Sequence, residues 1–204
     1  SSRVGGDVLL CPLYGALSLQ EQRKAILPAP VGQRKVVLAT NIAETSLTIE
    51  GIRLVVDSAQ ERVARFDVRS GLTRLITQRV SQASMTQRAG RAGRLEPGVC
   101  VHLLAKDQAE RATAQSEAEI LQSDLSSLLL ELLQWGCNDP SQLSWLDTPP
   151  AVNLAAARRL LTQLGALADE RLTAKGQKMA ALGNDPRLAA MLVAADSDDE
   201  VATA

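Results

Sequence analysis

The chain has 204 residues, of which 46% are hydrophobic and 2% aromatic, and its formal net charge is −1. This composition predicts a soluble globular chain of one or two domains, and it excludes a membrane span because no long apolar run is free of charge. A broadly basic nucleic-acid-binding protein is also excluded, so contacts with a polyanion would come from local patches.

The cysteines and the histidine favour structural roles. Cys11, Cys100 and Cys137 are far apart, lack metal-ligand spacing and have apolar neighbours, which predicts buried, reduced thiols and no metal site. Since no secretory signal opens the sequence, we expect a cytoplasmic protein. The single histidine, His102, lies in an apolar run and is expected to be a satisfied strand residue.

Four short apolar runs in the first half predict an α/β fold. They are residues 8–14, 35–40, 52–57 and 99–104. Their hydrophobicity is continuous, which is typical of parallel strands buried on both faces. Between the first two runs, Ser18 and Glu21 form a capping-box pattern and Pro28 ends the expected helix, so this part predicts a βαβ unit.

A polar segment, "TNIAETSLTI", follows the second run from Thr40 to Ile49. Ligands of doubly wound sheets bind at the carboxyl ends of strands, so this position favours a binding site. Taken alone, the segment is more simply explained as an ordinary capped turn.

Residues 61–80 predict a protruding β-hairpin, because two strand-like runs flank "RSG" and Gly71 can take a positive φ. Five arginines oppose Glu61 and Asp67, which gives a net charge of +3. The arginines are Arg62, Arg65, Arg69, Arg74 and Arg79. They would either contact nucleic-acid phosphates or only keep an exposed hairpin solvated.

The octapeptide "QRAGRAGR" follows the hairpin and contains no acidic residue. At helical spacing, Gln87, Arg91 and Arg94 fall at i, i+4 and i+7, which places them on one face. The alanines and glycines between them leave that face open to a large ligand. An anion is the expected ligand.

From about residue 120 the pattern becomes helical. A leucine stripe ends at Gly136, and a second helix follows Asn153 and closes at Gly165. The stripe consists of Leu125, Leu128, Leu129, Leu132 and Leu133. The short hairpin "ALADERLT" and the helix "AKGQKMAAL" come next, which predicts a winged-helix domain. The final "DSDDEVATA" would begin another helix or form a solvated tail.

Two of these segments carry a family resemblance. "ATNIAETSLTIEGIRLVVD" followed by "SQASMTQRAGRAGR" resembles motifs V and VI of the DEAH-box (DEAH/RHA) branch of superfamily 2 RNA helicases. The residues between them look like the bacterial HrpB type in particular, and the later "LTAKGQKMAALGNDPRLAAML" resembles the junction of winged helix and helical bundle in this family. The resemblance covers almost the whole chain.

The resemblance implies an α/β fold with a partial RecA-like parallel sheet and a β-hairpin insertion. An α-helical winged-helix domain and the start of a helical bundle would follow. The implied bounds are 1–110 for the second RecA-like lobe, 111–185 for the winged helix and 186–204 for the bundle.

In such helicases ATP binds between two RecA-like lobes. The resemblance implies that Gln87 lies near the γ-phosphate and the attacking water, and that Arg91 and Arg94 are arginine fingers. Thr45 would also bind the nucleotide. Arg88 points away from the expected face and would make lobe contacts.

The resemblance also implies contacts with the RNA backbone, because hydroxyl and amide groups suit phosphates and 2′-OH groups without reading bases. The implied residues of the first segment are Thr40, Asn41, Ser46 and Thr48. In the hairpin, Arg69 and Arg74 would contact phosphates, and Phe66 would stack on an end base if it is not packed inward.

The sequence departs from the family pattern because it has no G-x-x-x-x-G-K-[ST] and no D-E-x-H. ATP and Mg²⁺ would therefore be bound mainly by a first lobe outside these residues. The strand and helix that normally open the second lobe are also missing before "VLLCPLY". We therefore expect a fragment of an enzyme, with an uncovered apolar sheet edge and concentration-dependent association.

The expected partners are RNA, with single-stranded DNA as the other option, and the first lobe of the same protein, with no membrane. Two other hypotheses differ in class. One is a short non-catalytic module that binds nucleic acid or a partner. The other is a DNA-reading winged helix, which is disfavoured because residues 154–164 carry only Arg158 and Arg159.

Overall fold

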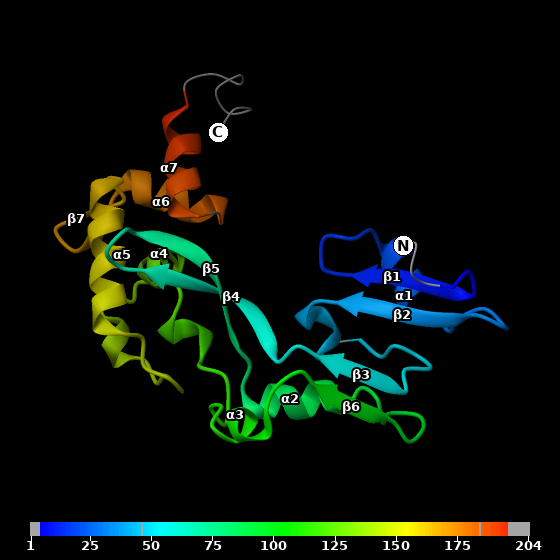
Figure 1. Ribbon diagram of the computed structural model, residues 1–204. Coiled ribbons are helices and arrows are strands. Elements are labelled where there is room, and N and C mark those ends of the chain that lie inside the picture. Colours follow the sequence, from blue (N-terminus) through cyan, green and yellow to red (C-terminus); the bar gives the residue numbers. More distant parts are fainter. Residues whose placement is uncertain (1–4, 46, 184, 196–204) are drawn as a thin grey trace. The chain divides into compact units, whose positions relative to one another are not determined.

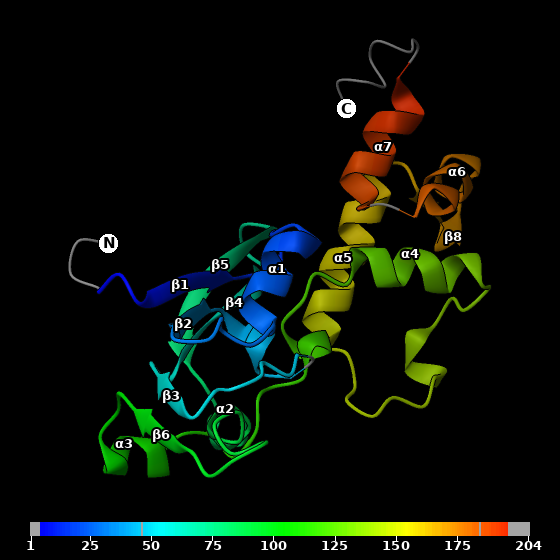
Figure 2. The same ribbon diagram turned by 90° about the vertical axis from the view of Figure 1, so that its right-hand side faces the viewer.

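The computed structural model describes residues 5–45, 47–183 and 185–195. These residues form two compact units (Figures 1 and 2). Unit 1 combines residues 1–63 with 77–116, and unit 2 combines residues 64–76 with 117–204. The predicted tail at 196–204 lies outside the described residues.

The strands of unit 1 form where the apolar runs predict them. β1 (Val8–Leu13) pairs in parallel with β2 (Arg34–Ala39), and β3 (Leu54–Asp57) pairs in parallel with β6 (Val99–His102). Within the described residues, hydrogen bonds join these strands into two separate pairs. The parallel α/β architecture is confirmed.

The expectation that these strands are buried on both faces is wrong. Leu38 is 62% exposed, and Leu54, Val56 and Val99 are 59%, 60% and 60% exposed. Apolar side chains leave water only where another layer packs on them, and no described element covers these four.

Helix α1 (Leu19–Ile26) confirms the predicted βαβ unit. Ser18 Oγ accepts from the Glu21 backbone N at 3.3 Å, and Glu21 Oε2 accepts from the Ser18 backbone N at 3.0 Å. This reciprocal capping satisfies two N–H groups at the helix start. Ala25 is fully buried against β1.

The predicted hairpin is present. β4 (Gln60–Asp67) and β5 (Leu72–Arg79) pair in a two-stranded sheet (Figure 1). Gly71 has a φ of 67° and donates its N–H to Asp67 O at 2.8 Å. The Asp67 carboxylate accepts from Ser70 Oγ at 2.7 Å, which with a further backbone bond lowers its pKa. These bonds close the turn.

Unit 1 also contains η1 (Asn41–Ala43), α2 (Gln82–Ala89) and α3 (Lys106–Glu110). The helices and strands of unit 2, besides the hairpin tip, are η2 (Glu119–Leu121), α4 (Ser126–Gln134), η3 (Pro140–Gln142), α5 (Ala151–Gln163), β7 (Leu167–Ala168), β8 (Arg171–Leu172), α6 (Ala174–Leu182) and α7 (Pro186–Ala194).

Unit 2 has the predicted winged-helix order: helix, helix, short hairpin, helix (Figure 2). Leu129, Leu161 and Met179 have no exposed surface and form the centre of its core. Strands β7 and β8 form the short hairpin, which we call the wing. Its turn residues, Asp169 and Glu170, both have positive φ, as a two-residue hairpin turn of this kind requires.

One predicted helix boundary is wrong, because α5 begins at Ala151 rather than after Asn153. Pro150 precedes the first helical residue, where its fixed φ and missing N–H cost nothing. Asn153 lies within the first turn, 8% exposed, and its side-chain amide donates to Ser123 O at 3.2 Å.

The prediction of buried thiols holds only for Cys11, since Cys100 and Cys137 are half-buried. All three are free thiols. The described helices include none that is long and apolar enough to cross a bilayer.

Replacing Gly176 in α6 with alanine is expected to destabilise the chain, which is the opposite of the usual effect in a helix. Alanine normally stabilises a helix interior relative to glycine, by about 0.5–1 kcal/mol. A Cβ at Gly176, however, would lie 2.3 Å from Ala166 O and 2.9 Å from Leu172 Cδ1. We expect Gly176→Ala to lower the free energy of unfolding by about 1–3 kcal/mol in urea titrations.

Gly15 provides the matched control, since a Cβ there meets no atom within 4 Å. Gly15→Ala should leave stability within about 0.5 kcal/mol of the parent, the usual range for surface changes. A Gly176→Ala chain as stable as the parent would contradict the packing described for α6.

Candidate functional site

The predicted catalytic residues lie together around an open hollow of about 370 Å³ in unit 1. It is lined by Thr45, Gln87, Gly90, Arg91 and Arg94, and we call it the arginine hollow. Thr45 comes from the segment after β2, and the other four come from the end of α2 and the turn that follows.

The expectation of one continuous helical face is wrong, because α2 ends at Ala89. Beyond it, the Arg91 and Ala92 backbone N–H groups donate to carbonyls three residues earlier, at 3.1 Å each. Glycine weakens a helix, so Gly90 and Gly93 let the backbone tighten here. The tightened turn still brings both arginines to the hollow.

Arg91 is oriented by backbone carbonyls of the segment after β2. Its Nη1 donates to Leu47 O at 2.9 Å, and its Nη2 donates to Thr45 O at 2.9 Å and also to Glu44 O. Burial lowers the pKa of Arg91, and the charge of Arg94 lowers it further. An arginine keeps its charge at physiological pH despite such shifts.

Arg94 and Gln87 are exposed at the hollow. Arg94 Nη1 donates to Thr48 Oγ1 at 3.0 Å, and its other N–H donors have no hydrogen-bond partner among the described residues. Within the described ranges, neither Arg91 nor Arg94 forms an ion pair with a carboxylate. Two guanidinium groups without acidic partners make the hollow suited to an anion such as a phosphate.

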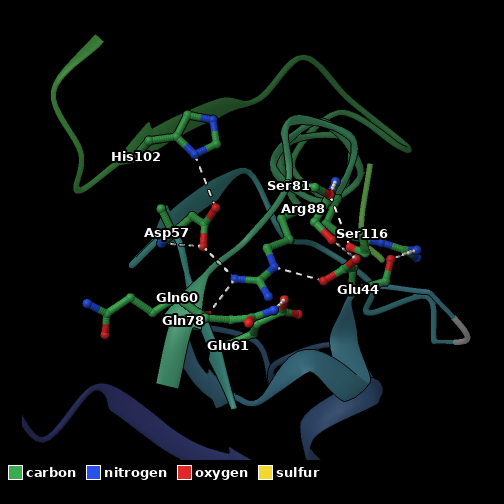
Figure 3. A network of polar contacts seen from close by, with 12 residues as sticks. Glu44, Asp57, Gln60, Glu61, Gln78, Ser81, Arg88, His102 and Ser116 are labelled. Atoms are coloured by element: carbon green, nitrogen blue, oxygen red, sulfur yellow. Dashed lines mark hydrogen bonds and ion pairs between the residues drawn. The ribbon is translucent and has the colours of Figure 1, made fainter. Parts of the chain in front are cut away.

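The lobe contacts expected for Arg88 lie inside unit 1, in the network that Figure 3 shows. Its Nε donates to Glu44 Oε2 at 2.9 Å, and its Nη1 donates to Asp57 Oδ1 and to Gln60 O, both at 3.0 Å. The Arg88 side chain is 13% exposed. Burial opposes its charge, but the bonds to Glu44 and Asp57 outweigh this and raise its pKa.

Asp57, at the end of β3, is the most deeply buried acid of this network, with 3% of its side chain exposed. Its Oδ1 also accepts from the Ala59 backbone N at 3.0 Å, and its Oδ2 lies 3.1 Å from His102 Nδ1. Burial raises the pKa of Asp57, but these bonds and Arg88 lower it below its ordinary value. The prediction that His102 is a satisfied strand residue is confirmed.

Sequence reasoning missed Glu44 and Asp57. Each lies far from Arg88 in the chain, by 44 and 31 residues respectively. The signals in the sequence were two acidic residues: Glu44 within a polar segment, and Asp57 at the end of a predicted strand.

The residues predicted to contact RNA after β2 lie at the surface of unit 1. Thr40, Asn41 and Thr48 are exposed, and the Thr40 backbone N donates to Leu13 O at 3.1 Å. Ser46 lies outside the described residues. Their contacts with RNA stay a prediction.

The hairpin arginines differ in whether their side chains are bonded to other residues of the chain. Arg65 pairs with Glu117 at 3.2 Å and donates to Gln122 Oε1 at 3.3 Å. In contrast, the exposed side chains of Arg69 and Arg74 make no hydrogen bond or ion pair with the rest of the described chain. Arg62 and Arg79, nearer the base of the hairpin, are also exposed and unpaired within the described residues, so Arg69 and Arg74 are the unpaired hairpin arginines nearest the turn.

Two hydrogen bonds to backbone groups of the hairpin hold its tip within unit 2. The Phe66 N–H donates to Gln122 O at 2.8 Å, and Arg187 Nη2 donates to Gly71 O at 3.0 Å. Arg187 Nη1 is in turn 3.0 Å from Asp124 Oδ2. The Phe66 side chain is half-buried.

The described part of the chain contains no group of three or more His, Cys, Asp or Glu residues that could hold a metal ion.

Two family models match the chain. Residues 3–96 match the helicase conserved C-terminal domain, and residues 157–183 match the winged-helix helicase associated domain (HA2).

Relatives and solved structures agree with these matches. The chain is 82% identical over its whole length to the ATP-dependent RNA helicase HrpB of Escherichia coli K12, of which it spans 25%. It is 42% identical over 189 residues to the pre-mRNA-splicing factor ATP-dependent RNA helicase prp22 of Schizosaccharomyces pombe, covering 92% of this chain and 16% of that protein. A crystal structure of the E. coli DEAH/RHA helicase HrpB matches 99% of this chain with a TM-score of 0.94 and 83% identity, and the match covers 26% of that structure.

Proposed function

This chain belongs to the DEAH/RHA helicase family, and we propose that it provides part of the second RecA-like lobe and the winged helix of an ATP-dependent RNA helicase. The chain spans about a quarter of the E. coli relative, so the activity is proposed for the larger protein. The observation that supports it most is the grouping of Gln87, Arg91 and Arg94 around one hollow, where no carboxylate of the described residues forms an ion pair with either arginine.

The proposed roles follow from the charge of the hollow. Arg91 and Arg94 stabilise the negative charge that develops on the transferred phosphoryl group of ATP. Gln87 orients the attacking water, and Thr45 lies beside the nucleotide. ATP and Mg²⁺ would be bound mainly by a first RecA-like lobe, which we place elsewhere in the same protein and which supplies the metal-assisted part of the chemistry.

For RNA, we propose backbone contacts from the segment after β2 and from the hairpin tip. The residues are Thr40, Asn41, Ser46, Thr48, Arg69 and Arg74. Single-stranded DNA offers the same phosphates without the 2′-OH, so a parallel titration with DNA of the same sequence separates the two ligands.

Within the larger protein, we propose domain bounds of 1–110, 111–185 and 186–204, and a cytoplasmic location. The alternative, a non-catalytic binding module, is not favoured, because the relatives that match almost the whole chain are named ATP-dependent RNA helicases.

The first test compares the chain with the complete enzyme. With RNA, ATP and Mg²⁺, we expect residues 1–204 alone to release no phosphate above an Arg91→Ala, Arg94→Ala double variant, because these arginines assist chemistry that another lobe holds. The complete enzyme should release phosphate in an RNA-stimulated manner. Turnover by residues 1–204 above the double variant, from chains that melt cooperatively, would contradict the proposal.

A further inference from the structure

The carboxylate of Glu44 is held at both oxygens by helix α2. Arg88 Nε donates to Oε2 at 2.9 Å (Figure 3). Ser84 Oγ donates to Oε1 at 2.6 Å. The Glu44 side chain is 13% exposed, so these bonds act in a partly dehydrated environment where they are stronger than in water.

The backbone of the same residue faces the arginine hollow. Glu44 O accepts from Arg91 Nη2, and the next carbonyl, Thr45 O, accepts from the same nitrogen at 2.9 Å. The position of the Glu44 backbone therefore decides where two of the carbonyls that orient Arg91 lie. Its side chain and its carbonyl link α2 to Arg91 through one residue.

Glu44 can be replaced without leaving the charge of Arg88 unpaired, because Arg88 has a second carboxylate partner. Arg88 also bonds Asp57, whose position is fixed independently by Ala59 N and His102. Removing one partner of a buried ion pair is costly mainly because the other charge is left unpaired. Arg88 would keep Asp57, so a Glu44 variant should fold.

We infer that Glu44 is a positioning residue: its carboxylate, held by Arg88 and Ser84, fixes the backbone that aims Arg91 into the arginine hollow. The inference rests on the proposed role of Arg91 in ATP hydrolysis. It gives Arg88 and Ser84 a function that needs no contact with the nucleotide.

The test uses the complete enzyme and compares two Glu44 variants. Glu44→Ala frees the segment, and we expect kcat for RNA-stimulated ATP hydrolysis to fall about 10- to 100-fold, the range for a small misplacement of a catalytic group. Glu44→Gln keeps an acceptor for Arg88 and a partner for Ser84, so it should recover most of the loss. If Glu44 acted on the reaction through its charge, the glutamine variant would be as impaired as the alanine variant, and this would overturn the inference.

Glu50 provides the control, because it is an exposed glutamate that follows the same segment. Glu50→Ala should leave kcat within about twofold, as surface changes away from a site do. Thermal melts of all variants separate loss of folded enzyme from loss of turnover. If Glu44→Ala does not fold, Ser84→Ala takes its place in the comparison. That variant removes only one of the two side-chain bonds to the Glu44 carboxylate.

A double-mutant cycle with Arg91→Ala tests the route of the effect. If Glu44 acts through Arg91, adding Glu44→Ala to Arg91→Ala should lower kcat by less than about twofold further, because coupled residues are not additive. A full multiplicative loss would overturn the inference and leave the role of Arg91 intact. An Arg91→Ala enzyme with normal kcat would instead refute the proposed function, and the inference with it.

Discussion

Replacing Arg94 with lysine in the complete enzyme is expected to lower kcat for ATP hydrolysis nearly as much as replacing it with alanine, by on the order of 10³-fold. Lysine retains the positive charge but loses the planar fork that bridges two phosphate oxygens. The structure supports this choice of residue, because Arg94 is exposed at the hollow and, among the described residues, only its Nη1 makes a side-chain hydrogen bond, to Thr48. Steady-state phosphate release at saturating ATP and RNA measures the effect.

Arg23→Lys is the matched control, since Arg23 is an exposed arginine on α1, outside the hollow. It should leave kcat unchanged. Near-normal turnover in Arg94→Lys would remove the arginine-finger assignment from Arg94, whereas a loss in both variants would indicate a general effect of arginine replacement.

The second large effect is expected at the hairpin tip. Replacing Arg69 and Arg74 together with glutamine should weaken RNA binding by the complete enzyme to a similar degree for unrelated sequences. It should also reduce the slope of log Kd against log salt by about 1.5 to 2, since each phosphate contact releases counterions. ATP hydrolysis without RNA should survive, because both arginines lie outside the arginine hollow.

Arg65 is left out of this variant because its guanidinium is already paired with Glu117 and Gln122. Arg171→Gln is the control, an exposed arginine of the wing in the same unit. RNA affinity and salt slope that stay at parental values in the double variant would mean that Arg69 and Arg74 only keep an exposed strand solvated.

Much of the fold was predictable from short-range patterns. The capping box of Ser18 and Glu21 predicted α1, the "RSG" turn predicted the β4–β5 hairpin, and the winged-helix order followed from apolar periodicity and glycines. Such patterns depend on neighbours within a few residues, which the sequence displays directly. Exposure of the strands was not predictable in this way, because it depends on which layers pack against them.

The candidate site was predictable in its residues but not in its geometry. Gln87, Arg91 and Arg94 do line one hollow, yet through a tightened turn instead of a helix face. The roles of Glu44 and Asp57 depend on contacts across 44 and 31 residues, and no local spacing marks such pairs. The same limit applies to Arg65, whose partner Glu117 lies 52 residues away.

The central claim is that Arg91 and Arg94 stabilise the transition state of ATP hydrolysis in a site completed by another lobe. The most direct test compares two ligands of the complete enzyme: ADP with Mg²⁺, and the same with aluminium fluoride, which mimics the phosphoryl group in transfer. In an Arg91→Ala, Arg94→Ala variant, we expect the Kd of ADP to stay within about threefold and the Kd of the mimic to rise by about 100-fold or more, because transition-state interactions are lost selectively. Equal changes for both ligands, or no change for the mimic, would contradict the claim.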